Sequence, residues 1–245
     1  WDLSNGTCRH SIEVNLHVGK HAASNEEVFV PNNGDEDDED GTIDAINIHT
    51  GVISSSPRQA WCTERIELHL CGNFLLAAVP DDDPDTAEEG AHKAGIYVLD
   101  RSSLELMNHV AGSYSCIKSA ANGDVVAKKA YDGRFEVFHL VDDRLVFRTS
   151  FERCCTHTHQ NYESILLVHN SKAYIHQAGP ASCIEVYNIL TGDLERTLWH
   201  PPGRVDVGQF PRCLVAGKKE LFCGFNTSAG RIRNATSAIK VYLLD

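Results

Sequence analysis

The chain has no long apolar run: no stretch of about 18 consecutive apolar residues occurs, which excludes a membrane-spanning helix. Its first residues, Trp-Asp-Leu-Ser-Asn-Gly, carry neither a basic nor an apolar region, so they do not resemble a secretory signal peptide. Methionine is scarce as well. Met107 is the single methionine, and the chain does not begin with one. We therefore expect an excised or processed piece of a longer protein, cut inside a repeat.

The sequence also lacks the short motifs of common enzymes. It has no Gly-x-Ser-x-Gly nucleophile elbow, no His-Glu-x-x-His zinc motif and no glycine-rich loop of the phosphate-binding form. Its 13 histidines form no catalytic constellation that the sequence reveals. We therefore predict a protein that is not an enzyme, with no cofactor and no metal.

One segment carries metal-ligating residue types at close spacing. Cys154–His159 reads Cys-Cys-Thr-His-Thr-His, and thiolate and imidazole are zinc ligands. On a strand His157 and His159 would share one face, whereas adjacent cysteines point to opposite faces. Surface histidines beside a buried cysteine are the preferred interpretation. A propeller enzyme or zinc-binding protein that uses this segment remains the alternative.

Cysteine usage indicates a reducing compartment. The nine cysteines are odd in number and scattered, and several lie in apolar strands, as in Leu68-His69-Leu70-Cys71. Such residues behave as small buried hydrophobes, so we predict an intracellular protein, cytoplasmic or nuclear. Three glycosylation sequons, at Asn5, Asn226 and Asn234, leave a secreted propeller as a further alternative.

The net charge of −12 comes from two short segments. Residues 35–40 contribute six acids, and residues 81–89 contribute six more, while the rest of the chain has 22 acidic and 22 basic residues. Such runs are solvated insertions, or they attract a basic partner through long-range electrostatics. We take residues 35–40 and 81–94 as acidic insertions. The predicted partner-binding residues are Asp35, Glu36, Asp37, Asp38, Glu39, Asp81, Asp82, Asp83 and Asp85.

A calcium loop is a weaker interpretation of the first acidic run. Glu36, Asp38, Asp40 and Asp44 mimic the alternating oxygen ligands of an EF-hand. However, Asn47 stands where the bidentate acid should be, and the flanks have the pattern of strands. Asp40-Gly41 more simply predicts a tight turn in which glycine accepts a positive φ.

A repeated pattern decides the fold. Apolar β-rich strands that end in a small polar turn recur 40 to 55 residues apart. They are Trp1–Gly6, Thr42–Gly51, Gly95–Asp100, Phe135–Leu140, Ile184–Gly192 and Ile239–Leu244. Between them, alternating strands are joined by turns such as Gly72-Asn73 and Asn122-Gly123. The pattern predicts four-stranded antiparallel units, each of which needs neighbours to cover both faces.

The sequence therefore predicts an all-β chain, a single β-propeller domain over residues 1–245 with about five to six blades. A strand from residues Thr7 to Val14 could complete the last blade. The segments Asp40–Gly51, Asp132–Phe138 and Ile184–Leu194 resemble WD40 repeats, which close with an Asp-Gly turn, an apolar strand and a Thr-Gly turn. Trp1-Asp2 is the literal Trp-Asp pair. Gly95–Asp100 resembles the quinoprotein-like kind of propeller.

The resemblance to WD40 proteins implies a scaffold for protein–protein interactions. We predict that the acidic segments bind a basic protein partner. The basic spots at Lys218-Lys219 and Arg231–Arg233 are small, and the overall acidity opposes direct nucleic-acid binding. No membrane is expected among the partners. The sequence says nothing of the oligomeric state.

Overall fold

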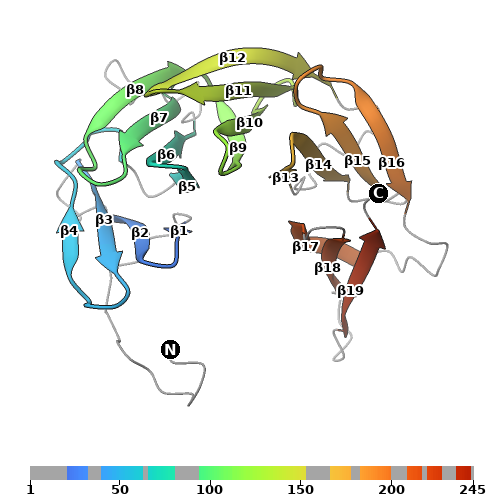
Figure 1. Ribbon diagram of the computed structural model, residues 1–245, viewed down its shortest axis with the longest axis horizontal. Coiled ribbons are helices and arrows are strands. Elements are labelled where there is room, and N and C mark those ends of the chain that lie inside the picture. Colours follow the sequence, from blue (N-terminus) through green and yellow to red (C-terminus); the bar gives the residue numbers. More distant parts are fainter. Residues whose placement is uncertain are drawn as a thin grey trace. The chain divides into compact units, whose positions relative to one another are not determined.

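The computed structural model describes residues 21–32, 40–62, 66–80, 94–152, 166–177, 183–199, 209–216, 220–227 and 236–243. In these ranges nineteen strands form five antiparallel sheets, four of them four-stranded, and there is no helix (Figure 1). Accordingly, no helix long and apolar enough to cross a membrane occurs in this part of the chain. The all-β class predicted from the sequence is confirmed.

The first sheet consists of β1 (Ala22–Ala23), β2 (Glu27–Asn32), β3 (Thr42–Asn47) and β4 (Ile53–Ser55). The second consists of β5 (Glu67–Cys71), β6 (Phe74–Val79), β7 (Gly95–Asp100) and β8 (Leu106–Ala111). The third consists of β9 (Tyr114–Ser119), β10 (Asp124–Lys129), β11 (Phe135–Val141) and β12 (Arg144–Phe151).

The fourth sheet consists of β13 (Leu166–His169), β14 (Lys172–Gln177), β15 (Cys183–Asn188) and β16 (Leu194–Trp199). The fifth has three strands in the described residues: β17 (Gln209–Ala216), β18 (Glu220–Thr227) and β19 (Thr236–Leu243). In every sheet the strands follow one another in sequence order. Five of the six repeated segments are β3, β7, β11, β15 and β19, the third strand of each sheet. The sixth, Trp1–Gly6, lies outside the described residues, as does Thr7–Val14.

The chain forms two compact units. Unit 1 contains Trp1–Gly133 and Phe138–Phe147, and unit 2 contains Arg134–Val137 and Arg148–Asp245. In unit 1, β7 is buried on both faces, which explains its unbroken apolar sequence. Tyr97 and Leu99 pack in one core cluster with Phe29 of the first sheet. Ile96 and Val98 pack in a second cluster with residues of the third sheet. The second sheet is therefore packed between the first and the third.

Unit 2 repeats this face-to-face packing. Tyr174 and Val186 of the fourth sheet pack against Leu221 and Cys223 of the fifth. On the other face of β15, the ring of Tyr187 stacks on that of Phe151, with the centroids 4.4 Å apart. Stacked four-stranded sheets of this kind are the building blocks of a propeller. The single-domain organisation over residues 1–245 stays a prediction.

The turns confirm most of the expected turn residues and correct one. Gly51 and Gly192, in the predicted Thr-Gly turns, have φ of 73° and 82°, a conformation that glycine adopts without strain. Gly41 was expected to need a positive φ, and that expectation is wrong, because it is not among the positive-φ glycines. A Cβ there would lie 2.3 Å from the Cys62 carbonyl oxygen, so Gly41 is required by close backbone approach instead.

Candidate functional site

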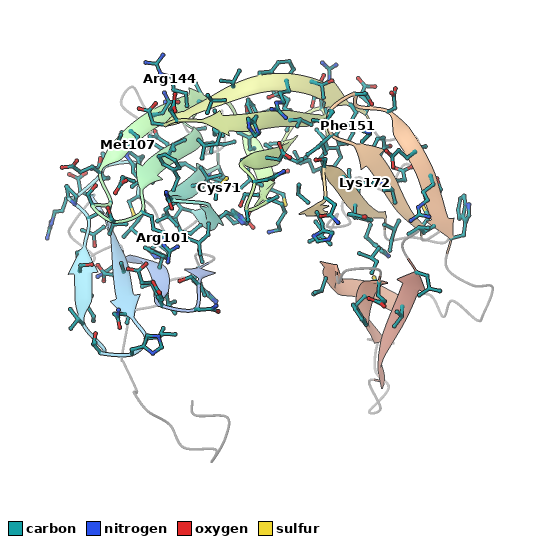
Figure 2. All side chains as sticks on the ribbon, viewed as in Figure 1. Cys71, Arg101, Met107, Arg144, Phe151 and Lys172 are labelled. Atoms are coloured by element: carbon teal, nitrogen blue, oxygen red, sulfur yellow. The ribbon has the colours of Figure 1, made fainter. Side chains whose placement is uncertain are left out.

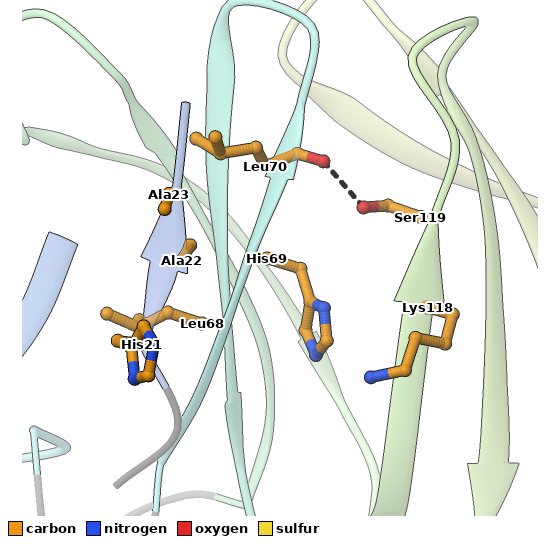
Figure 3. A pocket seen from close by; sticks show the side chains of 8 residues that line it. All are labelled: His21, Ala22, Ala23, Leu68, His69, Leu70, Lys118 and Ser119. Atoms are coloured by element: carbon orange, nitrogen blue, oxygen red, sulfur yellow. Dashed lines mark hydrogen bonds between the residues drawn. The ribbon is translucent and has the colours of Figure 1, made fainter. Parts of the chain in front are cut away.

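The first strands of three sheets lie side by side in unit 1. β5 lies between β1 and β9, and a hydrogen bond of 2.6 Å from the Ser119 hydroxyl to the Leu70 carbonyl oxygen joins β9 to β5 (Figure 3). Leu68 packs into the core shared with the first sheet, whereas Cys71 packs into the core shared with the third. Alternation along β5 thus ties it to both neighbours. These contacts fix the positions of β1, β5 and β9 around the space between them.

That space is a cavity of about 340 Å³. Its lining residues come from the three inner strands and the residue before β1: His21, Ala22, Ala23, Leu68, His69, Leu70, Lys118 and Ser119. We call it the inner-strand pocket. Figure 3 shows Lys118 reaching from β9 towards the imidazole of His69 on β5, with His21 on the far side of β5.

Three of the four polar residues that line the pocket are a lysine or a histidine. His69 is nearly buried, with 13% of its side chain exposed, and its Nε2 lies 3.8 Å from Oε2 of Glu67. Glu67 and His69 are two residues apart on β5, so they share a face of the strand. Lys118 is half-buried, and His21 is exposed. Lys118 and His69, which enter the same small space, can both donate hydrogen bonds to an anion.

None of the candidate site residues singled out from the sequence is among the described residues that line the inner-strand pocket. All nine predicted partner-binding acids, Asp35 to Glu39 and Asp81 to Asp85, are outside the described residues, and so is Cys154–His159. Asp40, the last acid of the first segment, is described and exposed. Asp44 of the calcium interpretation is buried and accepts a hydrogen bond of 2.9 Å from Asn32 Nδ2. Within the described ranges, no three His, Cys, Asp or Glu side chains are grouped as metal ligands.

The attachment points of the acidic segments are described. Residues 33–39 lie between β2 and β3, and residues 81–93 lie between β6 and β7. Each segment therefore joins the second strand of a sheet to the third. These sheets are the first and second, which share one core.

Five cysteines of the described part of the chain form no disulfide: Cys62, Cys71, Cys116, Cys183 and Cys223. Burial raises the pKa of Cys62 to about 12, although a backbone hydrogen bond to Asn32 lowers it, and burial raises the pKa of Cys71 to about 11. Both thiols therefore stay protonated at neutral pH and are poor nucleophiles. The expectation that cysteines serve as small buried residues is confirmed for Cys62, Cys71, Cys183 and Cys223.

Sequence reasoning missed the inner-strand pocket. The strands that carry His69 and Lys118 were predicted, but no local motif marks either side chain as part of a site. His21 precedes a strand of two residues, which leaves no alternating pattern to detect. A search for polar residues on the first strand of every repeat unit would have found two of the three.

No protein-family profile and no curated protein sequence matches the chain. Solved structures do. Hydrazine synthase from Kuenenia stuttgartiensis matches with a TM-score of 0.62 at 11% identity, over 98% of this chain and 66% of that one. A complex of KlAtg21 with the coiled-coil of AgAtg16 matches with a TM-score of 0.59 at 13% identity, over 92% of this chain and 70% of that one. Both are propeller proteins. Identities this low show fold alone, and together with the stacked four-stranded sheets they establish that this chain has the β-propeller fold.

Proposed function

We propose that this chain is a WD40-like, non-enzymatic scaffold that binds a basic protein partner through its two acidic segments, residues 35–40 and 81–94. One observation carries the proposal. The two segments that hold the whole charge excess are attached at equivalent places, between the second and third strands of adjacent sheets. Acids that project together attract a basic partner more strongly than acids scattered over the surface.

The contacts of Arg101 indicate that the two acidic segments are attached at the same end of the strands in the first and second sheets. Arg101 follows β7 (Figure 2). Its guanidinium donates hydrogen bonds of 2.9 Å to Glu27 Oε2 and to the hydroxyl of Ser24, between β1 and β2. The turn after β7 and the turn after β1 therefore lie at the same end of the strands in the two sheets. Antiparallel strands reverse direction at each turn. The β2–β3 and β6–β7 connections, which contain the acidic segments, therefore both begin and end at the opposite end of the strands.

The separation of the two attachment points is held by a packed core. Phe29 and Ile43 of the first sheet and Leu75 and Tyr97 of the second are buried in one cluster. Trp61, Tyr97 and His109 stack in series beside them, with centroids 4.3 and 4.1 Å apart. A rigid base lets two charged segments act on one partner without a further ordering cost for the sheets.

The fold neighbours support a scaffold role by analogy. KlAtg21 was solved in complex with a coiled-coil, so one propeller of this general fold holds a helical protein partner. Fold analogy is an associational argument, and the partner of this chain is inferred from its own charge distribution. An intracellular location is part of the proposal, and it is supported by the five described cysteines that form no disulfide.

The test is a quantitative pull-down from native lysate with four forms of the whole chain. One form is unchanged, and two carry Asn and Gln in place of the acids of residues 35–40 or of residues 81–89. The matched control is D142N/D143N, which neutralises the exposed Asp142 and the half-buried Asp143 between β11 and β12.

We expect the same basic proteins to be lost from the pull-downs with both segment variants and retained in the pull-down with the control. Their binding should also weaken between low and physiological salt, because exposed charges are screened. Identical protein lists from all four forms would refute the acidic segments as a binding surface.

A further inference from the structure

The inner-strand pocket has a chemistry that the acidic segments do not explain. His69 on β5, Lys118 on β9 and His21, just before β1, line it with side chains that can donate hydrogen bonds. In Figure 3 the Lys118 amine and the His69 imidazole point into the same space between β5 and β9. We propose that this pocket binds the phosphate group of a small phosphorylated ligand, with Lys118 and His69 as its principal contacts.

The hydrogen-bond donors of the pocket favour an anion. Lys118 carries a full positive charge, and no ion pair joins it to another of the described residues. Glu67 is the carboxylate that pairs with a lining residue. Its Oε2 lies 3.8 Å from Nε2 of His69, and Glu67 is 7% exposed. The lysine charge is thus balanced by one acid, and each imidazole adds one ring N–H that can donate a hydrogen bond. A half-buried amine forms stronger charge-assisted hydrogen bonds than a fully solvated one.

Two donors that enter one space from different sides suit a phosphate. A carboxylate presents two oxygens in one plane, whereas a phosphate presents three in different directions. Lys118 on β9 and His69 on β5 enter the space between these two strands from different sides, whereas His21 lies on the far side of β5 (Figure 3). The hydroxyl of Ser119 already donates to the Leu70 carbonyl oxygen, so it can only accept from a ligand. This hydrogen bond positions Lys118, its neighbour on β9.

The volume sets the size of the ligand. About 340 Å³ holds a phosphate together with a small organic group, at the lower end of ordinary ligand pockets. The apolar part of the lining, Ala22, Ala23, Leu68 and Leu70, offers contacts to that group. The proposal goes beyond the scaffold function, because the pocket and the acidic segments involve different residues.

The experiment titrates inorganic phosphate into the whole chain and follows the imidazole resonances by NMR. The expected result is a saturable shift of the His69 ring signals. Lys118→Gln and His69→Asn should each weaken binding about tenfold or more, because each removes a hydrogen bond to a charged group. Lys118→Arg should retain binding, since it keeps the positive charge. Thermal unfolding of every variant checks that it is folded.

The matched control is Lys129→Gln, on the neighbouring strand β10, which makes the same charge change outside the pocket lining. It should bind phosphate as the unchanged chain does. The proposal is overturned if phosphate produces no saturable shift, or if Lys129→Gln weakens binding as much as Lys118→Gln. A parallel titration with acetate tests the geometry. Acetate that binds as tightly as phosphate would overturn the assignment of a tetrahedral group.

Discussion

The hydroxyl of Tyr187 makes a buried hydrogen bond whose removal should destabilise unit 2. Tyr187 is 2% exposed, and its hydroxyl lies 2.9 Å from Oε2 of Glu185, which is fully buried. The Glu152 carbonyl oxygen is 3.3 Å from the same hydroxyl. The tyrosine ring also stacks on Phe151. Tyr187→Phe keeps the ring and its stacking, so it isolates the loss of the hydroxyl.

The magnitude follows from the partner of this hydroxyl. A hydrogen bond to a carboxylate contributes about 1.5–3 kcal/mol, and the loss is greatest when the carboxylate stays buried. We therefore expect Tyr187→Phe to lower the free energy of unfolding by about that amount, measured by urea denaturation followed by circular dichroism. Glu185→Gln and the double variant complete a cycle. Their coupling energy should reach at least about 1 kcal/mol.

The matched control is Tyr174→Phe. Tyr174 is 3% exposed and belongs to the core between the fourth and fifth sheets, but its hydroxyl makes no hydrogen bond with the residues described. This variant should change the free energy of unfolding by less than about 0.5 kcal/mol. Equal losses for Tyr187→Phe and Tyr174→Phe would refute the reasoning, since the hydrogen bond would then contribute nothing specific.

Three further predictions concern unit 1, and urea unfolding measures each of them. Gly41→Ala should cost about 1–3 kcal/mol, because the new Cβ would meet the Cys62 carbonyl oxygen; an unchanged midpoint would contradict that contact. The thiol of Cys62 ionises near pH 9 in the unfolded chain but near pH 12 in the folded one. Its contribution is therefore complete below pH 9 and is lost as the pH rises towards 12, and Cys62→Ala should flatten this part of the pH profile. Arg101→Met should cost about 1–2 kcal/mol, because it removes the hydrogen bonds to Glu27 and Ser24 from a position that is only 25% exposed. If Arg101→Met has the stability of the unchanged chain, the guanidinium does not hold the two sheets together.

The strands that the sequence located well are those with strong local signals. β6 and β7 have the predicted bounds, Phe74–Val79 and Gly95–Asp100, because each is an apolar run next to a turn or a polar segment. At the turn between β13 and β14, Asn170 and Ser171 both have positive φ, at 49° and 56°. Asparagine tolerates that conformation, so the local sequence determines the turn.

Other strands carry no such signal. β1 is two alanines, and β4 (Ile53–Ser55) is exposed along its whole length, so neither shows an alternating pattern. Both exist because β2 and β3 offer them backbone partners. The glycine at position 41 illustrates the same limit. Its sequence context favoured a positive φ, whereas packing against the backbone near Cys62 is the actual constraint.

The candidate sites divide in the same way. Charge is a property of residue identity, so the two acidic segments were recognised without a structure. The inner-strand pocket, in contrast, depends on which strands lie side by side in the folded chain. His21, His69 and Lys118 belong to three different repeat units, and each is unremarkable within its own strand.

The sequence by itself determined that this protein is all-β, that a unit of four strands recurs along it, and that its excess negative charge lies in two segments between strands. Alternation, turn residues and composition are local properties, and each is complete within a few residues. Only the tertiary structure decided which strands lie side by side, which faces are covered and which polar groups converge. Those outcomes depend on the stacking of one sheet on the next, which brings together residues that are far apart in the chain.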